Sequence, residues 1–334
     1  MSHLNFESRA LAGLWGAVVG DALGVPVEFR SRAEIQRNHV VDLRGHGTHN
    51  QPVGTWSDDT SLMLCTIDSL MVAPFNLEDM GQRFVRWGLG ELWTPWGKVF
   101  DIGIATRQAL SRIQADIPAV YAGGTDERSN GNGSLMRILP MALRFRDESA
   151  ERLLELTHGA SAVTHRHPRS HMACGLFCLV VRGLLRGQSA PEAHQDAARI
   201  FMEYYYEAKP FAGELPHFRA ILSESLATMP EREISSSGYV VHTLMAGLWC
   251  LLTSKDYRST VLKAVNLGDD TDTTGIVAGG LAGVHYGLSE VPEHWRKAMA
   301  RHDDLEALFG RFAAMSVTAA KLTPPSSAIT ATPA

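Results

Sequence analysis

The sequence predicts an all-α protein built as a single large multi-helix bundle. Along most of its 334 residues, apolar side chains recur at intervals of three and four, which is the period of an amphipathic helix. Alternating runs of β-branched residues, which are typical of strands, are scarce. Strand and helix patterns do not alternate either, and this argues against a parallel α/β sheet.

The expected helices follow one another with recognisable starts and stops. Residues 10–23 are small and apolar, and Trp15 and Val19 lie four positions apart. Residues 62–71 follow Ser57, a good N-cap, and acidic residues occupy the first turn. Apolar periodicity predicts further helices over residues 77–87, 149–163, 170–185, 190–206, 239–252, 256–266 and 273–286. The breaks carry residues that stop helices, such as Gly88, Gly187 and Pro210.

The bundle is expected to form one domain over residues 1–316. Segments 172–185 and 276–284 are apolar on every side, which is typical of central helices in a large bundle. No linker interrupts this region. Residues 317–334 are rich in Ala, Ser, Thr and Pro, and we expect a disordered tail there.

Composition and charge exclude several classes of function. The net charge of -5 is mild and the basic residues are scattered, so we expect no nucleic-acid partner. The polar N-terminus does not resemble a signal peptide, and the most apolar run, residues 172–181, is too short to span a membrane. The four cysteines include no CxxC pair and are expected to be buried thiols. We therefore expect a cytoplasmic protein.

Two short acidic clusters are the most informative features of the sequence. The first, Ser57-Asp58-Asp59, has a simple alternative reading as a capped helix start. The second is Asp270-Thr271-Asp272-Thr273, which follows Asp269 and precedes an apolar helix. Three carboxylates this close repel one another, so a positive partner is needed to offset the repulsion. Carboxylate and hydroxyl oxygens suit Mg²⁺, Mn²⁺ or Ca²⁺ rather than Zn²⁺.

A calcium-binding EF-hand matches the second cluster only in part. Counted from Asp270, the first positions fit, but position 12 is Leu281 where a bidentate Glu is required. Residues from 276 onward are also too apolar for a loop. The pattern therefore weakens the calcium reading without deciding between the other hard cations.

Two polar segments could bind a ligand or could be purely structural. Residues 130–134 read Asn-Gly-Asn-Gly-Ser and precede an apolar stretch, 135–145, expected to be helical. Such a loop can present backbone N–H groups to an anion, or Ser134 can simply cap the helix. Residues 165–171 are rich in histidine. Because the acidic clusters already offer hard ligands, these rings either satisfy a loop or contact substrate, and His165 is the better candidate.

Taken together and in order, the motifs resemble one family. They lie at residues 13–24, 26–28, 56–60, 101–103, 130–137, 164–168, 237–240 and 266–273. Over residues 10–288 the sequence resembles the ADP-ribosylglycohydrolases of the dinitrogen-reductase-activating type. The resemblance implies an orthogonal all-α fold around two Mg²⁺ or Mn²⁺ ions. It also implies a hydrolase that removes ADP-ribose from a modified protein side chain.

The resemblance assigns roles to individual residues. It implies metal ligands from both clusters, namely Ser57, Asp58, Asp59, Asp270, Asp272 and Thr273. Ser57 replaces a common Thr and retains the hydroxyl oxygen, whereas Asp269 stands where many members have glycine and is not assigned. Glu28 and Asp101 are the implied acid/base residues, although a surface carboxylate is the simpler reading of Glu28. The implied substrate-binding residues are Gly103, Asn130, Gly131, Asn132, Gly133, Ser134, Met136, His165, Gly238 and Tyr239.

The resemblance also bears on the linkage that is cleaved. The bacterial-type motifs favour arginine as the modified residue, with ADP-ribose as the product. A non-protein ADP-ribosyl substrate and a catalytically silent ADP-ribose-binding protein are the alternatives. A silent member is expected to have lost a metal ligand, whereas this chain retains all six candidate oxygen ligands.

Overall fold

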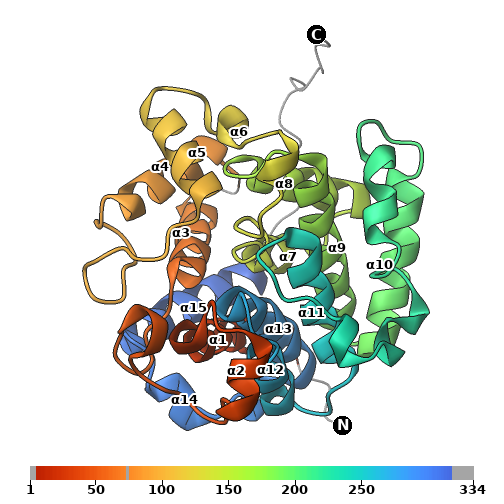
Figure 1. Cartoon of the computed structure of the whole chain (residues 1–334). Coiled ribbons are helices and arrows are strands. Elements are labelled where there is room, and N and C mark those ends of the chain that lie inside the picture. The colour runs from red at the N-terminus through yellow and green to blue at the C-terminus, as the bar shows by residue number, and fades with distance from the viewer. Residues whose placement is uncertain (1–4, 73–74, 318–334) are drawn as a thin grey trace.

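The computed structural model describes residues 5–72 and 75–317, and this part of the chain contains helices and loops but no sheet (Figure 1). The predicted all-α class is therefore confirmed. The helices are α1 (Phe6–Gly24), α2 (Arg32–Arg37), α3 (Asp58–Val72), α4 (Leu77–Gly88), α5 (Ile104–Gln114), α6 (Ala119–Ala122), α7 (Leu139–Arg144), α8 (Ala150–Ala162), α9 (Pro168–Leu185), α10 (Ala190–Tyr205), α11 (Val240–Leu252), α12 (Tyr257–Val265), α13 (Thr271–Tyr286), α14 (Glu293–Lys297) and α15 (His302–Val317). The tail predicted over residues 317–334 lies outside the described residues, except that Val317 ends α15.

Every predicted helix forms, with ends that differ by a few residues. Local capping explains this agreement. The Ser149 side chain accepts from the Arg152 N–H at the start of α8, and Asp256 forms a capping box at the start of α12. After α9, Gly187 has a φ of 87°, a left-handed conformation that glycine adopts without steric cost. All four cysteines are buried free thiols, as predicted.

The expected helix over residues 135–145 is wrong at its start. Helix α7 begins at Leu139, and residues 133–137 form turns instead. Pro140 gives the reason, because its ring would clash with the carbonyl of Met136 if the helix began earlier. The Asn130–Ser134 loop therefore does not lead directly into a helix N-terminus.

At the centre of the bundle, α1 and α13 run antiparallel in unusually close contact (Figure 1). Glycines recur every fourth residue on both helices: Gly16, Gly20 and Gly24 on α1, and Gly275, Gly279 and Gly283 on α13. A Cβ placed on Gly20 would lie only 2.1 Å from the Gly275 carbonyl oxygen. The two backbones thus touch directly, and only glycine fits at their crossing points.

Helix α1 is long and strongly apolar. Residues Phe6–Val27 are long and apolar enough to cross a membrane by length and composition, yet 94% of the apolar window is buried inside the protein. Such burial is typical of a core helix. Helices α3, α12 and α15 pack against α1, while α9 and α11 contact α13.

Candidate active site

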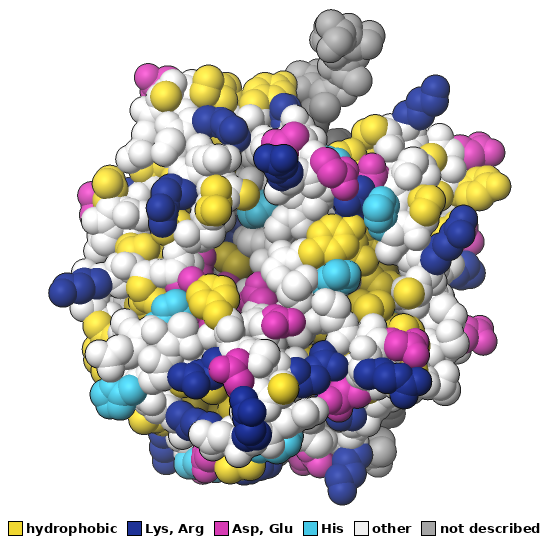
Figure 2. All heavy atoms as spheres, viewed as in Figure 1, with side chains coloured by type: hydrophobic (Ala, Val, Ile, Leu, Met, Phe, Trp, Pro, Cys, Tyr) yellow, Lys and Arg dark blue, Asp and Glu magenta, His cyan; other side chains and the backbone are white. Residues whose placement is uncertain are grey.

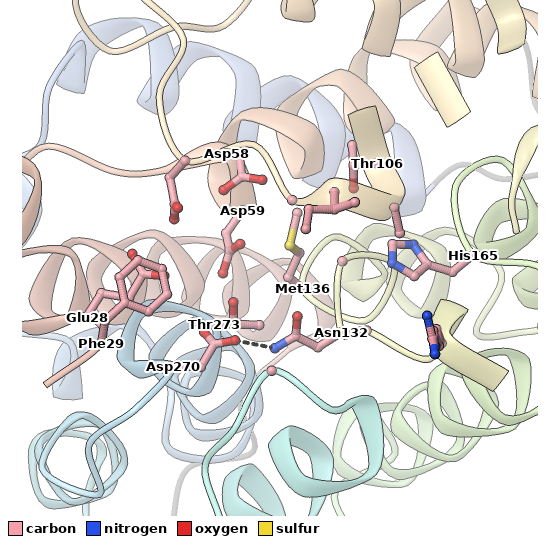
Figure 3. Close-up of a pocket in the computed structure, with 18 residues that line it drawn as sticks. Glu28, Phe29, Asp58, Asp59, Thr106, Asn132, Met136, His165, Asp270 and Thr273 are labelled. Carbon is pink, nitrogen blue, oxygen red and sulfur yellow. Dashed lines mark hydrogen bonds between the residues drawn. The ribbon is translucent and has the colours of Figure 1, made fainter. Parts of the chain in front are cut away.

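A cavity of about 310 Å³ opens where the ends of several helices meet. The N-termini of α3 and α13 supply Asp58, Asp59, Asp270 and Thr273, and the segment after α1 supplies Glu28. In Figure 3, these side chains point toward a common space. Figure 2 shows acidic and hydrophobic side chains gathered around a hollow in this face of the molecule. The two acidic clusters, about 210 residues apart in sequence, therefore share one cavity.

Close packing of α1 on α13 positions the second cluster. A Cβ placed on Gly24 would lie 2.3 Å from the backbone nitrogen of Asp272, so the end of α1 touches the start of α13. The hydroxyl of Thr271 donates to the Gly24 carbonyl oxygen at 2.8 Å. The chain that leaves α1 therefore carries Glu28 directly past the start of α13.

A buried carboxylate, Asp21, positions the first cluster. From α1, it accepts hydrogen bonds from the backbone N–H groups of Ser57 and Thr60 and from the Thr60 hydroxyl. The Ser57 hydroxyl in turn accepts from the Asp59 N–H and caps α3, as predicted. Burial raises the pKa of Asp21 to about 6. This buried acid thus fixes the start of α3 against α1.

Three carboxylate oxygens of the clusters are buried and have no hydrogen-bond partner: Asp59 Oδ2, Asp270 Oδ1 and Asp272 Oδ2. A buried unpaired oxygen costs free energy, and ionised oxygens cost more. Burial first, and then repulsion from neighbouring carboxylates, raises the pKa of Asp58, Asp59 and Asp272 well above the usual range. Hard divalent cations would satisfy these oxygens and remove the repulsion, so the residues present fit such ions.

Glu28 lies between the acidic clusters and a histidine. One of its carboxylate oxygens lies within 4.8 Å of ligand atoms of Asp270 and Asp272. Its Oε2 also lies 2.5 Å from His49 Nε2, and that nitrogen is 3.9 Å from Asp101 Oδ2. Burial, followed by the nearby Asp101 charge, raises the pKa of Glu28 to about 11. The two predicted acid/base residues therefore meet at His49, which the sequence did not reveal.

The loop Asn130–Ser134, which contains Gly131 and Gly133, forms another wall of the cavity. Its backbone pairs with residues 238–240: the Asn132 N–H donates to the Gly238 carbonyl oxygen, and the Val240 N–H donates to that of Asn130. The Asn132 side-chain amide donates to Asp270 Oδ2 at 2.9 Å (Figure 3). Through this bond, the loop and the second acidic cluster hold each other in place.

His165 packs against the same loop and faces the cavity (Figure 3). A Cβ on Gly133 would lie 2.7 Å from the His165 ring, so glycine permits this contact. His165 Nδ1 is 2.9 Å from the Thr164 hydroxyl. Burial lowers the pKa of His165 to about 3, so the ring is neutral at physiological pH. His165 is thus placed as a cavity-lining group rather than a remote loop residue.

Most predicted substrate residues line the cavity, namely Gly103, Gly131, Asn132, Gly133, Met136, His165 and Gly238. Ser134 does not, because its buried hydroxyl accepts from Ser161 and contacts Cys174 on the opposite side. Asn130 donates to the Glu127 carbonyl oxygen, and Tyr239 lies over Arg169. Ser57 and Asp272 are buried and do not line the cavity, although a carboxylate oxygen of Asp272 lies within 4.8 Å of one of Glu28.

The sequence reasoning missed several residues around the cavity. Phe29, Ile104, Thr106 and Arg128 line it, and His49 bonds to Glu28. None of them belongs to a recognisable chemical pattern in the sequence. Asp21 is different, because a single acid inside an apolar helix is a signal that could have been followed.

Comparisons with known proteins agree with this geometry. The family model described as ADP-ribosylglycohydrolase matches residues 2–321. The chain is 32% identical over 302 residues to the ADP-ribosylarginine hydrolase Tri1 of Pseudomonas putida, covering 90% of this chain and 76% of that protein. It is 28% identical to the ADP-ribosyl-[dinitrogen reductase] glycohydrolase of Rhodospirillum rubrum, covering 88% and 91%.

A solved structure extends the match to three dimensions. The structure titled ADP-ribosylglycohydrolase-related protein complex superimposes with a TM-score of 0.77 at 31% identity. The match covers 93% of this chain and 99% of the other. The chain therefore belongs to the ADP-ribosylglycohydrolase family of hydrolases, as its motifs predicted.

Proposed function

We propose that this protein removes ADP-ribose from arginine side chains of modified proteins and requires divalent metal ions to do so. The observation that carries the proposal is the cavity floor, where carboxylates from two helix N-termini leave three buried oxygens unpaired. The identity to an arginine-directed hydrolase supports the choice of linkage.

The acidic residues that would hold the cations are Asp58, Asp59, Asp270 and Asp272, with the hydroxyl groups of Ser57 and Thr273. Two Mg²⁺ or Mn²⁺ ions suit these oxygens. When bound, such ions would supply positive charge that orients the ribose and lowers the pKa of a nearby water.

The remaining chemistry belongs to side chains at the cavity wall. Hydrolysis breaks the bond between the anomeric carbon and the guanidine nitrogen and forms a bond from that carbon to a water oxygen. The water loses a proton and the leaving nitrogen gains one. One of Glu28 and Asp101 would accept the proton of the water and the other would give a proton to the leaving nitrogen; His49 lies close to both carboxyl groups.

Binding of the rest of the substrate would use the loop opposite the acids. Gly131 and Gly133 line the cavity, where their backbone would contact phosphate groups, and the neutral His165 offers a ring nitrogen to an oxygen. Such remote contacts orient the reacting end of the substrate.

A two-part experiment tests this function. Release of ADP-ribose from an arginine-modified protein should require Mg²⁺ or Mn²⁺ and stop on addition of a chelator. The double variant Asp58→Ala with Asp272→Ala should lose release entirely while its circular dichroism remains helical.

The matched control removes Asp196 and Glu203, two acids on α10 that pair with Arg199. This control should keep full activity. Activity of the Asp58/Asp272 variant at the wild-type level would disprove the metal site, and hydrolysis of serine-linked but not arginine-linked substrate would disprove the linkage.

A further inference from the structure

Two large hydrophobic side chains stand exposed at the opening of the cavity. Phe29 has 68% of its surface exposed and Ile104 has 78%, yet both line the cavity. Scattered exposed hydrophobic residues are ordinary on protein surfaces. Two that come from separate segments and border one catalytic cavity are more specific, since whatever enters the cavity must pass them.

The backbone holds Phe29 at the opening against its own preference. Its φ of 62° lies in the left-handed region, which a bulky side chain seldom adopts. Two backbone hydrogen bonds fix it there: the Phe29 N–H donates to the Asp269 carbonyl oxygen at 2.7 Å, and the Asp269 N–H donates to that of Arg30 at 2.8 Å. Because the ring stays exposed, no burial of the side chain offsets the free-energy cost of this conformation. The exposed ring at the cavity therefore points to contact with a ligand.

The rim residues are adjacent to the groups that act on the scissile bond. Phe29 directly follows Glu28, and its ring lies 6.1 Å from that of His49. Ile104 begins α5, three residues after Asp101. If Glu28 and Asp101 act at the bond that is cleaved, the leaving group lies close to Phe29 and Ile104, which adjoin them in the chain and line the same cavity. That leaving group is a side chain still attached to a protein.

We propose that Phe29 and Ile104 form a hydrophobic rim that binds the polypeptide around the ADP-ribosylated residue. This inference rests on the proposed function and adds the partner that the rim recognises: a protein segment with an apolar side chain beside the modified one. The cavity itself would bind the ADP-ribose group. The rim would bind the surrounding polypeptide, and the enzyme would therefore prefer a modified protein to the free modified amino acid.

The experiment compares two substrates with the same scissile bond, an arginine-ADP-ribosylated protein and free ADP-ribosyl-arginine. The variants are Phe29→Asn, Ile104→Ser and their combination, because Asn tolerates the left-handed backbone conformation. Losing both contacts should lower kcat/KM for the protein about 10-fold or more, mainly through KM. Hydrolysis of free ADP-ribosyl-arginine should stay within about twofold of wild type.

Tyr206→Asn provides the matched control, since Tyr206 is 64% exposed and does not line the cavity. It should change neither substrate. An equal loss on both substrates would mean that the rim contacts ADP-ribose, and no loss on either would mean that it contacts nothing; both results overturn the proposal. Wild-type protein that hydrolyses neither substrate would instead overturn the proposed function itself.

Discussion

The two helix N-termini that form the cavity floor carry similar acids but are held in different ways. The start of α3 is held by hydrogen bonds from its backbone and Thr60 to the buried Asp21. The start of α13 is held by direct backbone contact with α1 through glycines. Polar anchoring tolerates small changes of distance, whereas backbone contact tolerates none. The difference predicts which substitutions destroy the fold and which alter only the site.

The largest effect should come from the glycine contact. Gly20→Val places side-chain atoms against the Gly275 carbonyl oxygen, because even a Cβ would lie 2.1 Å from it. The helices must separate, and we expect a loss of about 4 kcal/mol or more in the free energy of unfolding. Urea denaturation followed by circular dichroism measures this.

Gly310→Ala is the control for that substitution. Gly310 lies within α15, and a Cβ there meets nothing within 4 Å. Alanine should therefore stabilise the protein by about 0.5–1 kcal/mol. If Gly20→Val were as stable as the control, the close packing of α1 on α13 would be wrong.

Removing Asp21, which holds the start of α3, should cause a smaller loss in the free energy of unfolding. Asp21→Ala leaves the Ser57 and Thr60 donors unpaired in a buried place, which costs about 2–4 kcal/mol. It should also weaken Mn²⁺ binding, measured by calorimetry, since α3 loses its fixed position.

The comparison variant for Asp21 is Asp256→Ala, which removes the cap of α12 far from the cavity. That change should cost about 1 kcal/mol and leave Mn²⁺ affinity unaltered. Equal Mn²⁺ affinity in the two variants would show that Asp21 does not position the site.

The cation should stabilise the protein more at high pH than at low pH. A carboxyl group whose pKa is raised by folding weakens the folded state as pH rises above its unfolded value of about 4. Burial has this effect on Asp58, Asp59 and Asp272, and on Asp21 up to about pH 6. Bound cations offset this loss of stability. The increase in the free energy of unfolding that the cation produces should therefore grow by on the order of 1–2 kcal/mol between about pH 5 and pH 8.

The melting temperature with Mg²⁺ and with a chelator, compared across that range, measures this gain. The cation-free protein should lose stability as pH rises, and the loaded protein should lose less. A constant difference between the two curves would argue that the acids do not bind the cation.

The smallest effect concerns catalysis alone. His49→Ala removes the ring that contacts Glu28 and Asp101, and we expect kcat to fall on the order of 10-fold with KM nearly unchanged. The pH–rate profile should shift as well, because Glu28 loses its partner. His49→Gln keeps a hydrogen-bond donor and should restore part of kcat, whereas an unchanged profile in both variants would exclude His49 from positioning the acids.

The features that could be predicted from the sequence are those whose residues lie close together along the chain. Caps such as Ser149 and Asp256 lie within the segment they start, so helix boundaries can be read directly. The acidic clusters are also contiguous, and their hard oxygen ligands are visible without a structure. The short helix α2 contains too few residues to show a period. The longer helices α5 and α15, of 11 and 16 residues, are also absent from the prediction.

The missing parts of the site depend on contacts between distant segments. His49 reaches Glu28 across 21 positions, and only the folded loop brings them together. The family resemblance implies that Ser134 binds substrate, but in the turns before Pro140 its hydroxyl contacts Ser161 instead. A loop's backbone shape decides which side chains face inward, and residue types alone do not specify that shape.

The backbone contact between α1 and α13 also limits how the enzyme can move. Helices that touch through glycines have no intervening side chains that could change rotamer, so the pair behaves as one rigid body. Any change in the shape of the cavity must then come from segments outside these two helices, among them those that carry His49 and Asp101. The start of α13, and with it Asp270 and Asp272, should therefore keep its position whether or not a ligand is bound.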